Sequence, residues 1–223
     1  MGFIVALDGP AGSGKGTITK KVAEQTGLIN IDTGAMYRCV TLEMLKKDVK
    51  IEEIEKIKKI LDTIEIEFKK ENNSDKVYLN KEDVTLQIRS KEVNELVSQV
   101  SHIREVRENI TNLSRKVAEG KNVIMEGRDI GTNVFPNADV KIYLDATPEE
   151  RANRRYKQNQ ILGIDMPYEE ILENIKTRDK NDMEKEIGAL KKADDAVYID
   201  STNMNIEEVT NKVLEIINEK VVD

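Results

Sequence analysis

Short runs of apolar residues recur along the chain and alternate with segments that have helical periodicity. The runs occupy residues 3–7, 28–31, 122–125, 140–144 and 196–199, and polar residues follow each of them. Short apolar runs bounded by turn signals are typical of strands buried on both faces. Strands that alternate with helices form a parallel sheet with helices on both sides, so the pattern predicts an α/β fold with about five parallel strands.

Between these runs, apolar residues recur three and four positions apart, as on one face of a helix. We expect a helix from the glycine-rich segment after the first run to about Gly27, and another over Met36–Leu45. The stretch Ile51–Leu61 has a further helical stripe that faces a core. The remaining helices are expected over 91–100 and 104–118, and from near Pro148, Pro167 and Ile206.

One part of the chain has a different pattern. Residues 64–68 and 77–79 alternate apolar with polar positions on either side of the turn-like 72–74. This alternation predicts an antiparallel hairpin with one solvated face. A hairpin that interrupts strand–helix units indicates an insertion. We therefore expect a single domain over residues 1–223, with a core of 1–45 and 91–223 and an inserted α+β lobe of about 46–90.

Composition and charge exclude several classes of function. The chain has 223 residues and a formal net charge of −7 with both signs interspersed, so it lacks the basic footprint of a nucleic-acid-binding protein. It has no apolar run that could span a bilayer and no signal segment, so we expect a cytoplasmic protein without a membrane partner. The single Cys39 excludes an internal disulfide and predicts a small buried hydrophobe. Without a large exposed apolar stripe, a monomer is expected.

A glycine-rich segment follows the first apolar run and fits the pattern G-x-x-x-x-G-K. Between a strand and a helix, this pattern predicts a loop whose backbone N–H groups hold phosphates. Lys15 would add a cation for the β- and γ-phosphates. Gly16 stands where the usual loop has the Ser or Thr that holds Mg²⁺, and Thr17 comes next. The predicted nucleotide-binding residues are Gly9, Pro10, Ala11, Gly12, Ser13, Gly14, Lys15, Gly16 and Thr17.

Two further polar segments follow predicted strands, where ligands of parallel sheets bind. Asp32 would cap a helix that carries Arg38 one turn in, although an ordinary cap with a surface arginine has the same pattern. Arg128 and Asp129 lie between two glycines, and an ion-paired turn is the alternative interpretation there. The planar arginine fork matches a phosphate, and a carboxylate accepts from the exocyclic amine of a base.

Three arginines, at positions 151, 154 and 155, stand three and four residues apart in a predicted helix. At this spacing they share one face of the helix. A solvated face that pairs with Glu149 or Glu150 would have the same spacing.

Together these motifs carry a close resemblance to a known family. The phosphate loop is followed by Asp-Thr-Gly-Ala-Met-Tyr-Arg at 32–38, Gly-Arg-Asp-Ile-Gly-Thr at 127–132 and Glu-Arg-x-x-Arg-Arg at 150–155. In this order they resemble the bacterial cytidylate (CMP) kinases, a family of P-loop nucleoside monophosphate kinases, over nearly the whole chain. The resemblance implies transfer of the γ-phosphoryl group of ATP to CMP and dCMP, with Mg²⁺ as cofactor. The expected partners are then small-molecule nucleotides.

The resemblance also implies roles for individual residues. Arg38 and Arg128 would hold the phosphate of the acceptor; Ser98, Arg107 and Asp129 would read the cytosine; Arg178 and Asp182 would reach the sugar. Thr33 and Lys185 stand at further substrate-binding positions. Residues of about 151–167 would form a helical lid in which Arg151 and Arg154 neutralise the transferring phosphoryl group together with Lys15.

The chain departs from the family pattern at three places. Lys185 stands where the family commonly has Arg, and lysine lacks the planar fork for a bidentate contact to the base. Residues 189–190 are Ala-Leu where Pro-Leu is common. Glu126 replaces a more frequent Asp and would either hold Mg²⁺ through water or cap the turn.

The hydrogen-bonding pattern of cytosine supports the acceptor assignment independently. Asp129 can accept from the N4 amine, while uracil would leave the carboxylate facing an oxygen. A kinase of UMP, AMP or a non-nucleotide acid is the alternative enzyme. The alternative from another class is a nucleotide-dependent switch, but the chain has no Asn-Lys-x-Asp segment after the fourth strand.

Overall fold

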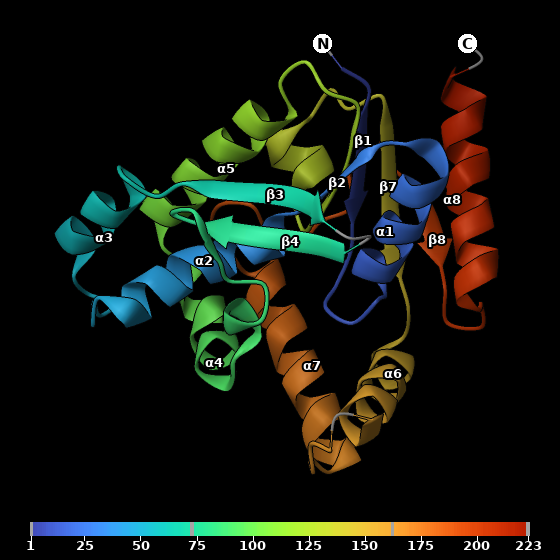
Figure 1. The fold of residues 1–223 in the computed structure, drawn as a ribbon. Helices are drawn as coiled ribbons and strands as arrows, with labels where there is room; N and C mark the ends of the chain where they lie inside the picture. Colours follow the sequence, from blue (N-terminus) through green and yellow to red (C-terminus); the bar gives the residue numbers. More distant parts are fainter. Residues whose placement is uncertain (1, 72–73, 162, 222–223) are drawn as a thin grey trace. The chain divides into compact units, whose positions relative to one another are not determined.

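The central element of the fold is a five-stranded sheet with strand order β2-β6-β1-β7-β8 (Figure 1). The computed structural model describes residues 2–71, 74–161 and 163–221. In it, β1 runs parallel to β6 and β7, and β7 runs parallel to β8. This sheet, flanked by helices, confirms the predicted α/β class. Its strands are β1 (Ile4–Asp8), β2 (Ile29–Asp32), β6 (Val123–Gly127), β7 (Val140–Asp145) and β8 (Val197–Asp200).

The chain divides into two compact units. The first contains Met1–Asn30 and Ala118–Asp223, and the second contains Ile31–Val117. The second unit includes the predicted insertion of about 46–90, but it begins and ends well outside that range. The division into core, inserted lobe and lid therefore stays a prediction.

In the first unit, strand alternation separates a buried core from the side chains of the site. Leu7, Ile142 and Leu144 pack on one face of the sheet against α1 (Lys15–Thr26) and α8 (Ile206–Val221). Each fully buried side chain of this kind stabilises the fold by about 1.5–3 kcal/mol. Since neighbours along a strand point to opposite faces, Tyr143 and Asp145 lie on the other face. The alternation of side chains along each strand thus also determines which polar groups face away from this core.

A helical hairpin extends from the sheet of the first unit. Its helices are α6 (Pro148–Ile161) and α7 (Tyr168–Met183), and both begin where prolines predicted them. Ala152, Ile171 and Ile175 form a small apolar cluster between the two helices. The hairpin therefore has its own apolar contacts.

The second unit combines helices with a small antiparallel sheet, and this sheet confirms the predicted hairpin. Strands β3, β4 and β5 pair in that order, whereas the predicted turn residues Asn72 and Asn73 lie outside the described residues. The two-residue β5 is too short to show a pattern, and sequence reasoning missed it. The elements are α2 (Thr33–Lys46), α3 (Ile54–Leu61), β3 (Ile66–Glu71), β4 (Ser74–Leu79), β5 (Glu82–Asp83), α4 (Lys91–Val100) and α5 (Arg104–Ala118).

Local chemistry explains where α2 begins and what it buries. Asp32 caps the helix, because its Oδ1 accepts a hydrogen bond of 3.0 Å from the Ala35 amide. Cys39 is fully buried, as expected for a small hydrophobe. Burial, with a smaller contribution from Asp32, raises the pKa of the Cys39 thiol to about 12. This thiol is therefore neutral and unreactive at physiological pH.

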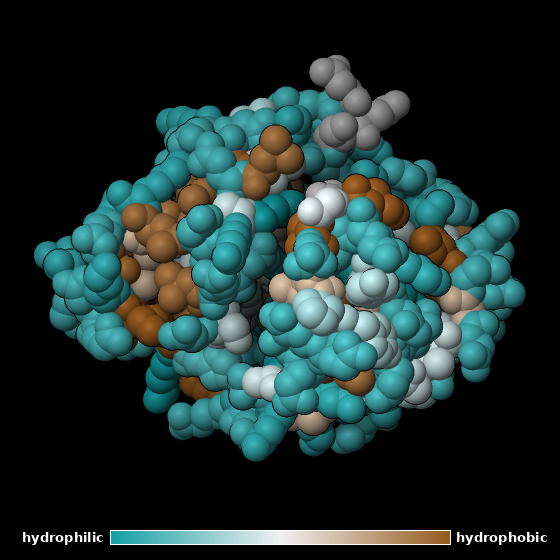
Figure 2. All heavy atoms as spheres, turned by 90° about the horizontal axis from the view of Figure 1, so that it is seen from below, coloured by the Kyte–Doolittle hydropathy of each residue, from teal (hydrophilic) through white to brown (hydrophobic). Residues whose placement is uncertain are grey.

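The surface is mainly polar. Hydrophilic side chains cover most of the face shown in Figure 2, and groups of hydrophobic residues interrupt them. Within the described part of the chain, none of the helices combines the length and apolarity needed to cross a bilayer.

Candidate active site

The phosphate loop connects β1 to α1, as its pattern predicts, and its backbone requires glycine. Gly12 and Gly14 have φ angles of 80° and 95°, which side chains other than hydrogen disfavour. A Cβ on Gly9 would lie 2.0 Å from the carbonyl oxygen of Leu144. Lys15 is buried, and its Nζ donates to the Pro10 carbonyl at 2.7 Å. The sequence context required of a phosphate loop is therefore present.

The next residue, Gly16, is explained by a neighbouring strand. A Cβ at this position would lie 2.9 Å from Oε1 of Glu126, which stands near the end of β6. The glutamate occupies the space that a serine or threonine side chain would need. Glu126 and the Thr17 hydroxyl offer the oxygen donors that Mg²⁺ prefers, so the residues present fit this ion. In the described ranges no cluster of three or more Asp, Glu, His or Cys could hold a metal alone.

A group of cations surrounds one carboxylate in the first unit. Asp182 accepts from Arg128 Nε at 3.1 Å and from Lys185 Nζ at 2.7 Å. Burial alone would raise the pKa of Asp182, but Arg128, Lys185 and Arg178 lower it to about 2. The structure thus brings together four residues that the resemblance assigned to the acceptor nucleotide.

The pKa of Lys15 in the phosphate loop depends on the charges of these cations. Burial, together with the positive charges of Arg128 and Arg178, lowers the pKa of Lys15 to about 7, while Glu126 and Asp8 oppose this lowering. Electrostatic interaction of this kind requires proximity. Arg128 and Arg178 therefore lie close enough to the phosphate loop for their charges to act on Lys15.

Asp129 lies beside a second carboxylate that sequence reasoning missed. Asp129 is buried, and its Oδ2 accepts from Asn133 Nδ2 at 2.9 Å. A π-helical turn, Ile130–Val134, follows it. Asp8, the last residue of β1, accepts from the amides of Ile130 and Gly131 at 2.8 and 2.7 Å. Its position directly before the phosphate loop was the available signal.

Burial of Asp8 has an electrostatic consequence. Desolvation raises the pKa of this carboxyl to about 6, although the two amides lower it and Asp129 raises it. Asp8 therefore carries a charge at neutral pH at a cost in free energy. The residue that holds the turn after Asp129 is also sensitive to mild acid.

In the second unit, Arg38 and Thr33 lie on α2. Nη1 of Arg38 donates to Asn94 Oδ1 at 2.5 Å and to the Ile88 carbonyl at 3.4 Å. Thr33 is buried at the first position of the helix. Contacts to α4 and to the turn before it thus orient the arginine within this unit.

Ser98 and Arg107 are linked through Ser101, which lies in the turn between α4 and α5. Arg107 is buried, and its Nη1 donates to the Ser101 carbonyl at 3.2 Å. Its guanidinium carbon lies 5.6 Å from the centre of the Tyr37 ring. The Ser101 hydroxyl in turn donates to the Ser98 carbonyl at 2.7 Å. Both predicted base-reading residues therefore bond to Ser101 in this turn, Arg107 through its side chain and Ser98 through its carbonyl.

Two of the three arginines of α6 contact the phosphate loop. Arg151 Nη1 donates to the Ala11 carbonyl at 3.0 Å, and Arg154 Nη1 donates to the Ser13 carbonyl at 3.2 Å. Arg154 also forms the ion pair with Glu150 that its spacing allows, at 2.9 Å. Arg155 is exposed and donates to Gln158.

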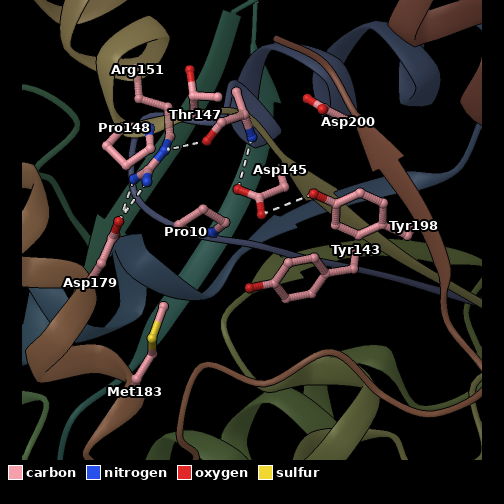
Figure 3. A pocket seen from close by; sticks show the side chains of 11 residues that line it. Pro10, Tyr143, Asp145, Thr147, Pro148, Arg151, Asp179, Met183, Tyr198 and Asp200 are labelled. Carbon is pink, nitrogen blue, oxygen red and sulfur yellow. Dashed lines mark hydrogen bonds and ion pairs between the residues drawn. The ribbon is translucent and has the colours of Figure 1, made fainter.

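A pocket of about 280 Å³ opens at the carboxyl ends of β7 and β8 (Figure 3). Tyr143 and Tyr198 stack with ring centres 6.2 Å apart, and Asp145 accepts from Tyr198 at 3.3 Å. The lining residues are Pro10, Tyr143, Asp145, Ala146, Thr147, Pro148, Arg151, Asp179, Met183, Tyr198 and Asp200. Pro10 of the phosphate loop and residues of α6 and α7 thus border this pocket.

Solved structures share the architecture. A gluconokinase from Sinorhizobium meliloti has a TM-score of 0.51 at 14% identity, with 98% of this chain and 92% of that chain covered. An uncharacterized protein from Eubacterium ventriosum has a TM-score of 0.53 at 14% identity, with 98% and 99% covered. These likenesses concern the fold alone. With the glycine-rich loop and its lysine at the end of β1, the fold defines a P-loop protein of the kinase type.

Sequence comparison adds the particular family. The family model described as cytidylate kinase matches residues 5–219. A cytidylate kinase of Caldicellulosiruptor bescii is 50% identical, over 95% of this chain and 94% of its own. One of Bacillus subtilis is 45% identical, over 97% and 96%. The chain belongs to the cytidylate kinase family, which confirms the resemblance of its four motifs.

Proposed function

We propose that this protein transfers the γ-phosphoryl group of ATP to CMP and dCMP, giving ADP and the nucleoside diphosphate. Membership of the cytidylate kinase family supports the reaction and the acceptor. The observation that carries the proposal is the electrostatic link between Lys15 and the cations Arg128 and Arg178. A lysine proposed for the donor phosphates thus lies near two arginines proposed for the acceptor nucleotide, as direct transfer between two nucleotides requires.

The donor phosphates would lie on the amides of the loop. Lys15, now bonded to the Pro10 carbonyl, would turn to the β- and γ-oxygens. Thr17 and Glu126 would hold Mg²⁺, directly or through water. When bound, Mg²⁺ neutralises charge on the phosphate oxygens and orients them.

The acceptor would be held by the residues that the family resemblance assigns to it. Arg38 and Arg128 would bind its phosphate, and Ser98, Arg107 and Asp129 would read the cytosine. Arg178 and Asp182 would contact the sugar. Lys185 donates to Asp182 at 2.7 Å, so in this chain it orients that carboxylate. Lysine thus keeps a positive charge on Asp182 without the planar fork of an arginine.

Charge on the transferring group would be neutralised mainly by Lys15 and Arg154. The contact of Arg154 with the Ser13 carbonyl already places its guanidinium beside the loop. We further propose that the lobe of about 46–90 and the lid of about 151–167 close over the substrates and exclude water. A cytoplasmic, monomeric enzyme of pyrimidine nucleotide metabolism would fit these features.

A substrate screen tests the proposal. ADP release is measured by a coupled assay with ATP, Mg²⁺ and each of CMP, dCMP, UMP and AMP. Fast turnover is expected with CMP and dCMP. Fast turnover with UMP or AMP but not with CMP would overturn the proposed acceptor. ADP release that needs no acceptor would support a nucleotide-dependent switch instead.

A further inference from the structure

Arg151 is an arginine whose hydrogen bonds are directed into the protein. Its Nε donates to the Ala146 carbonyl at 2.9 Å. Its two terminal nitrogens form a fork with Asp179, at 3.1 and 2.6 Å, and one of them also donates to the Ala11 carbonyl at 3.0 Å. A guanidinium has five N–H donors, so little of its capacity is left for a phosphate. Figure 3 shows the fork closing on Asp179.

The ion pair joins three parts of the first unit. Arg151 lies in the first turn of α6, and Asp179 lies in the last turns of α7. Arg151 and Asp179 are buried, with only 3% and 6% of their surfaces exposed. Gly12 packs against the base of the Arg151 side chain, since a Cβ there would lie 3.4 Å from Cβ of Arg151. The base of the helical hairpin is thus tied to the phosphate loop.

This contact determines where loop amides point. In a planar trans peptide, the carbonyl oxygen and the N–H of the same unit point in opposite directions. Arg151 holds the Ala11 carbonyl, so the N–H of Gly12 is directed to the opposite side of the loop. Arg154 does the same for the Ser13 carbonyl and the N–H of Gly14.

Stability by itself does not account for the arrangement. A buried ion pair gains about as much from attraction as it loses through desolvation, so hydrophobic residues often replace it without loss. What such a pair provides is a defined geometry, because a bidentate fork fixes the guanidinium plane. In this protein, the same guanidinium group also donates to the Ala11 carbonyl of the loop.

We infer that the Arg151–Asp179 pair is a clamp that positions the phosphate loop for the donor triphosphate. Asp179 is then a positioning residue that acts through Arg151, and Arg151 acts through the loop. This differs from the role that the resemblance implied for Arg151. The inference rests on the proposed use of the loop for ATP, and it goes beyond the family assignment.

The test uses the full-length enzyme with Asp179→Asn and Arg151→Lys. Asparagine keeps the shape of the carboxylate without its charge, and lysine keeps the charge without the fork. Binding of ATP and of inorganic tripolyphosphate is measured by calorimetry in the absence of CMP. Both variants should bind both ligands about 10-fold or more weakly, because a charge-assisted hydrogen bond is lost. The KM for CMP should stay within about two-fold.

A matched control comes from the same two helices. Glu149 of α6 pairs with Lys176 of α7 at 3.6 Å, and both side chains are largely exposed. Glu149→Gln makes the same chemical change between the same helices without touching the loop, and binding should be unaltered. The double variant R151K/D179N should bind no worse than the weaker single variant, because both changes remove one clamp.

Two outcomes would overturn the clamp. In the first, R151K lowers kcat at saturating ATP while D179N behaves like the unaltered enzyme, which would mean that Arg151 contacts the transferring group. In the second, both variants lower the melting temperature but bind tripolyphosphate normally, which would mean a purely structural pair. If D179N does not fold, Asp179→Glu, which keeps the charge and displaces the fork, takes its place. CMP turnover by the unaltered enzyme tests the proposed function separately.

Discussion

Two buried carboxylates of the first unit experience opposite electrostatic surroundings. Asp182 is buried but lies among Arg128, Lys185 and Arg178, and its pKa falls to about 2. Asp8 is buried and accepts from two backbone amides, and burial raises its pKa to about 6. The same functional group thus serves two purposes. One carboxylate orders cations of the proposed acceptor site, and the other holds the turn that follows Asp129.

Replacing Arg128 should affect one substrate and spare the other. Arg128→Ala removes a guanidinium from the proposed phosphate site and leaves Asp182 with fewer cations. A charge-assisted hydrogen bond contributes 1.5–3 kcal/mol, so kcat/KM for CMP should fall roughly 10- to 150-fold. The KM for ATP should change by less than about two-fold, as steady-state kinetics would show. Activity within a few-fold of the unaltered enzyme would contradict the assignment.

Replacing Asp129 should alter the choice of base. Asp129→Asn replaces an acceptor by a side chain that can also donate, so uracil O4 would find a partner. We expect the ratio of kcat/KM for CMP to that for UMP to fall about 10-fold or more. Competition assays with both nucleotides measure this ratio directly. An unchanged preference would show that Asp129 does not read the base.

Among the secondary-structure elements, the contact between β6 and α1 explains why the phosphate loop has glycine at position 16. Glu126 near the end of the strand fills the space beside Gly16 at the start of the helix. A residue with a Cβ fits there only if the carboxylate moves. The glycine at position 16, where the usual loop has Ser or Thr, is therefore linked to the glutamate at position 126.

This link can be tested with a pair of substitutions. Gly16→Ala places a Cβ 2.9 Å from Oε1 of Glu126, the far end of a flexible side chain, so this carboxylate must turn away from its proposed place beside Mg²⁺. Turnover should fall about 10-fold. Adding Glu126→Asp, which shortens the side chain by one methylene, should restore part of it.

Gly27 provides the control for this pair at the other end of α1. A Cβ on Gly27 would meet no atom within 4 Å, so Gly27→Ala should cost stability, through its φ of 77°, but not activity. Equal loss of activity from the two alanine substitutions would contradict the linkage.

Across the whole molecule, the dependence of stability on pH reflects both carboxylates. Asp8 binds its proton more tightly in the folded state than in the unfolded state. Its contribution to the free energy of unfolding therefore declines by about 3 kcal/mol as the pH rises from about 4 to about 6. Asp182 acts in the opposite sense. Its contribution is present above about 4 and is lost as the pH falls towards about 2. The two effects occupy separate pH ranges.

Asp8→Asn should remove the decline between pH 4 and pH 6. Urea unfolding at several pH values measures the free energy of unfolding of both proteins, and their difference isolates Asp8. In Asp195→Asn the decline should persist, because a hydrogen bond from Lys141 lowers the pKa of Asp195. A decline that persists in Asp8→Asn would contradict the assigned burial.

Much of the fold was predictable because its determinants are local. The periods of apolar residues located all five strands of the sheet, and the predicted helices 91–100 and 104–118 coincide with α4 and α5. The π-helical turn after Asp129 and the short β5 were missed. Neither has a sequence period, and the turn depends on the Asp8 carboxylate from a distant strand.

By itself, the sequence determined the fold class, the phosphate loop and the family, because these depend on spacing along the chain. Only the tertiary structure decided which charges face one another. It paired Arg151 with Asp179 across two helices, placed Glu126 against Gly16 and surrounded Asp182 with cations. The physical reason is that electrostatic interactions depend on distance and burial in space, and residues far apart in the chain supply both partners.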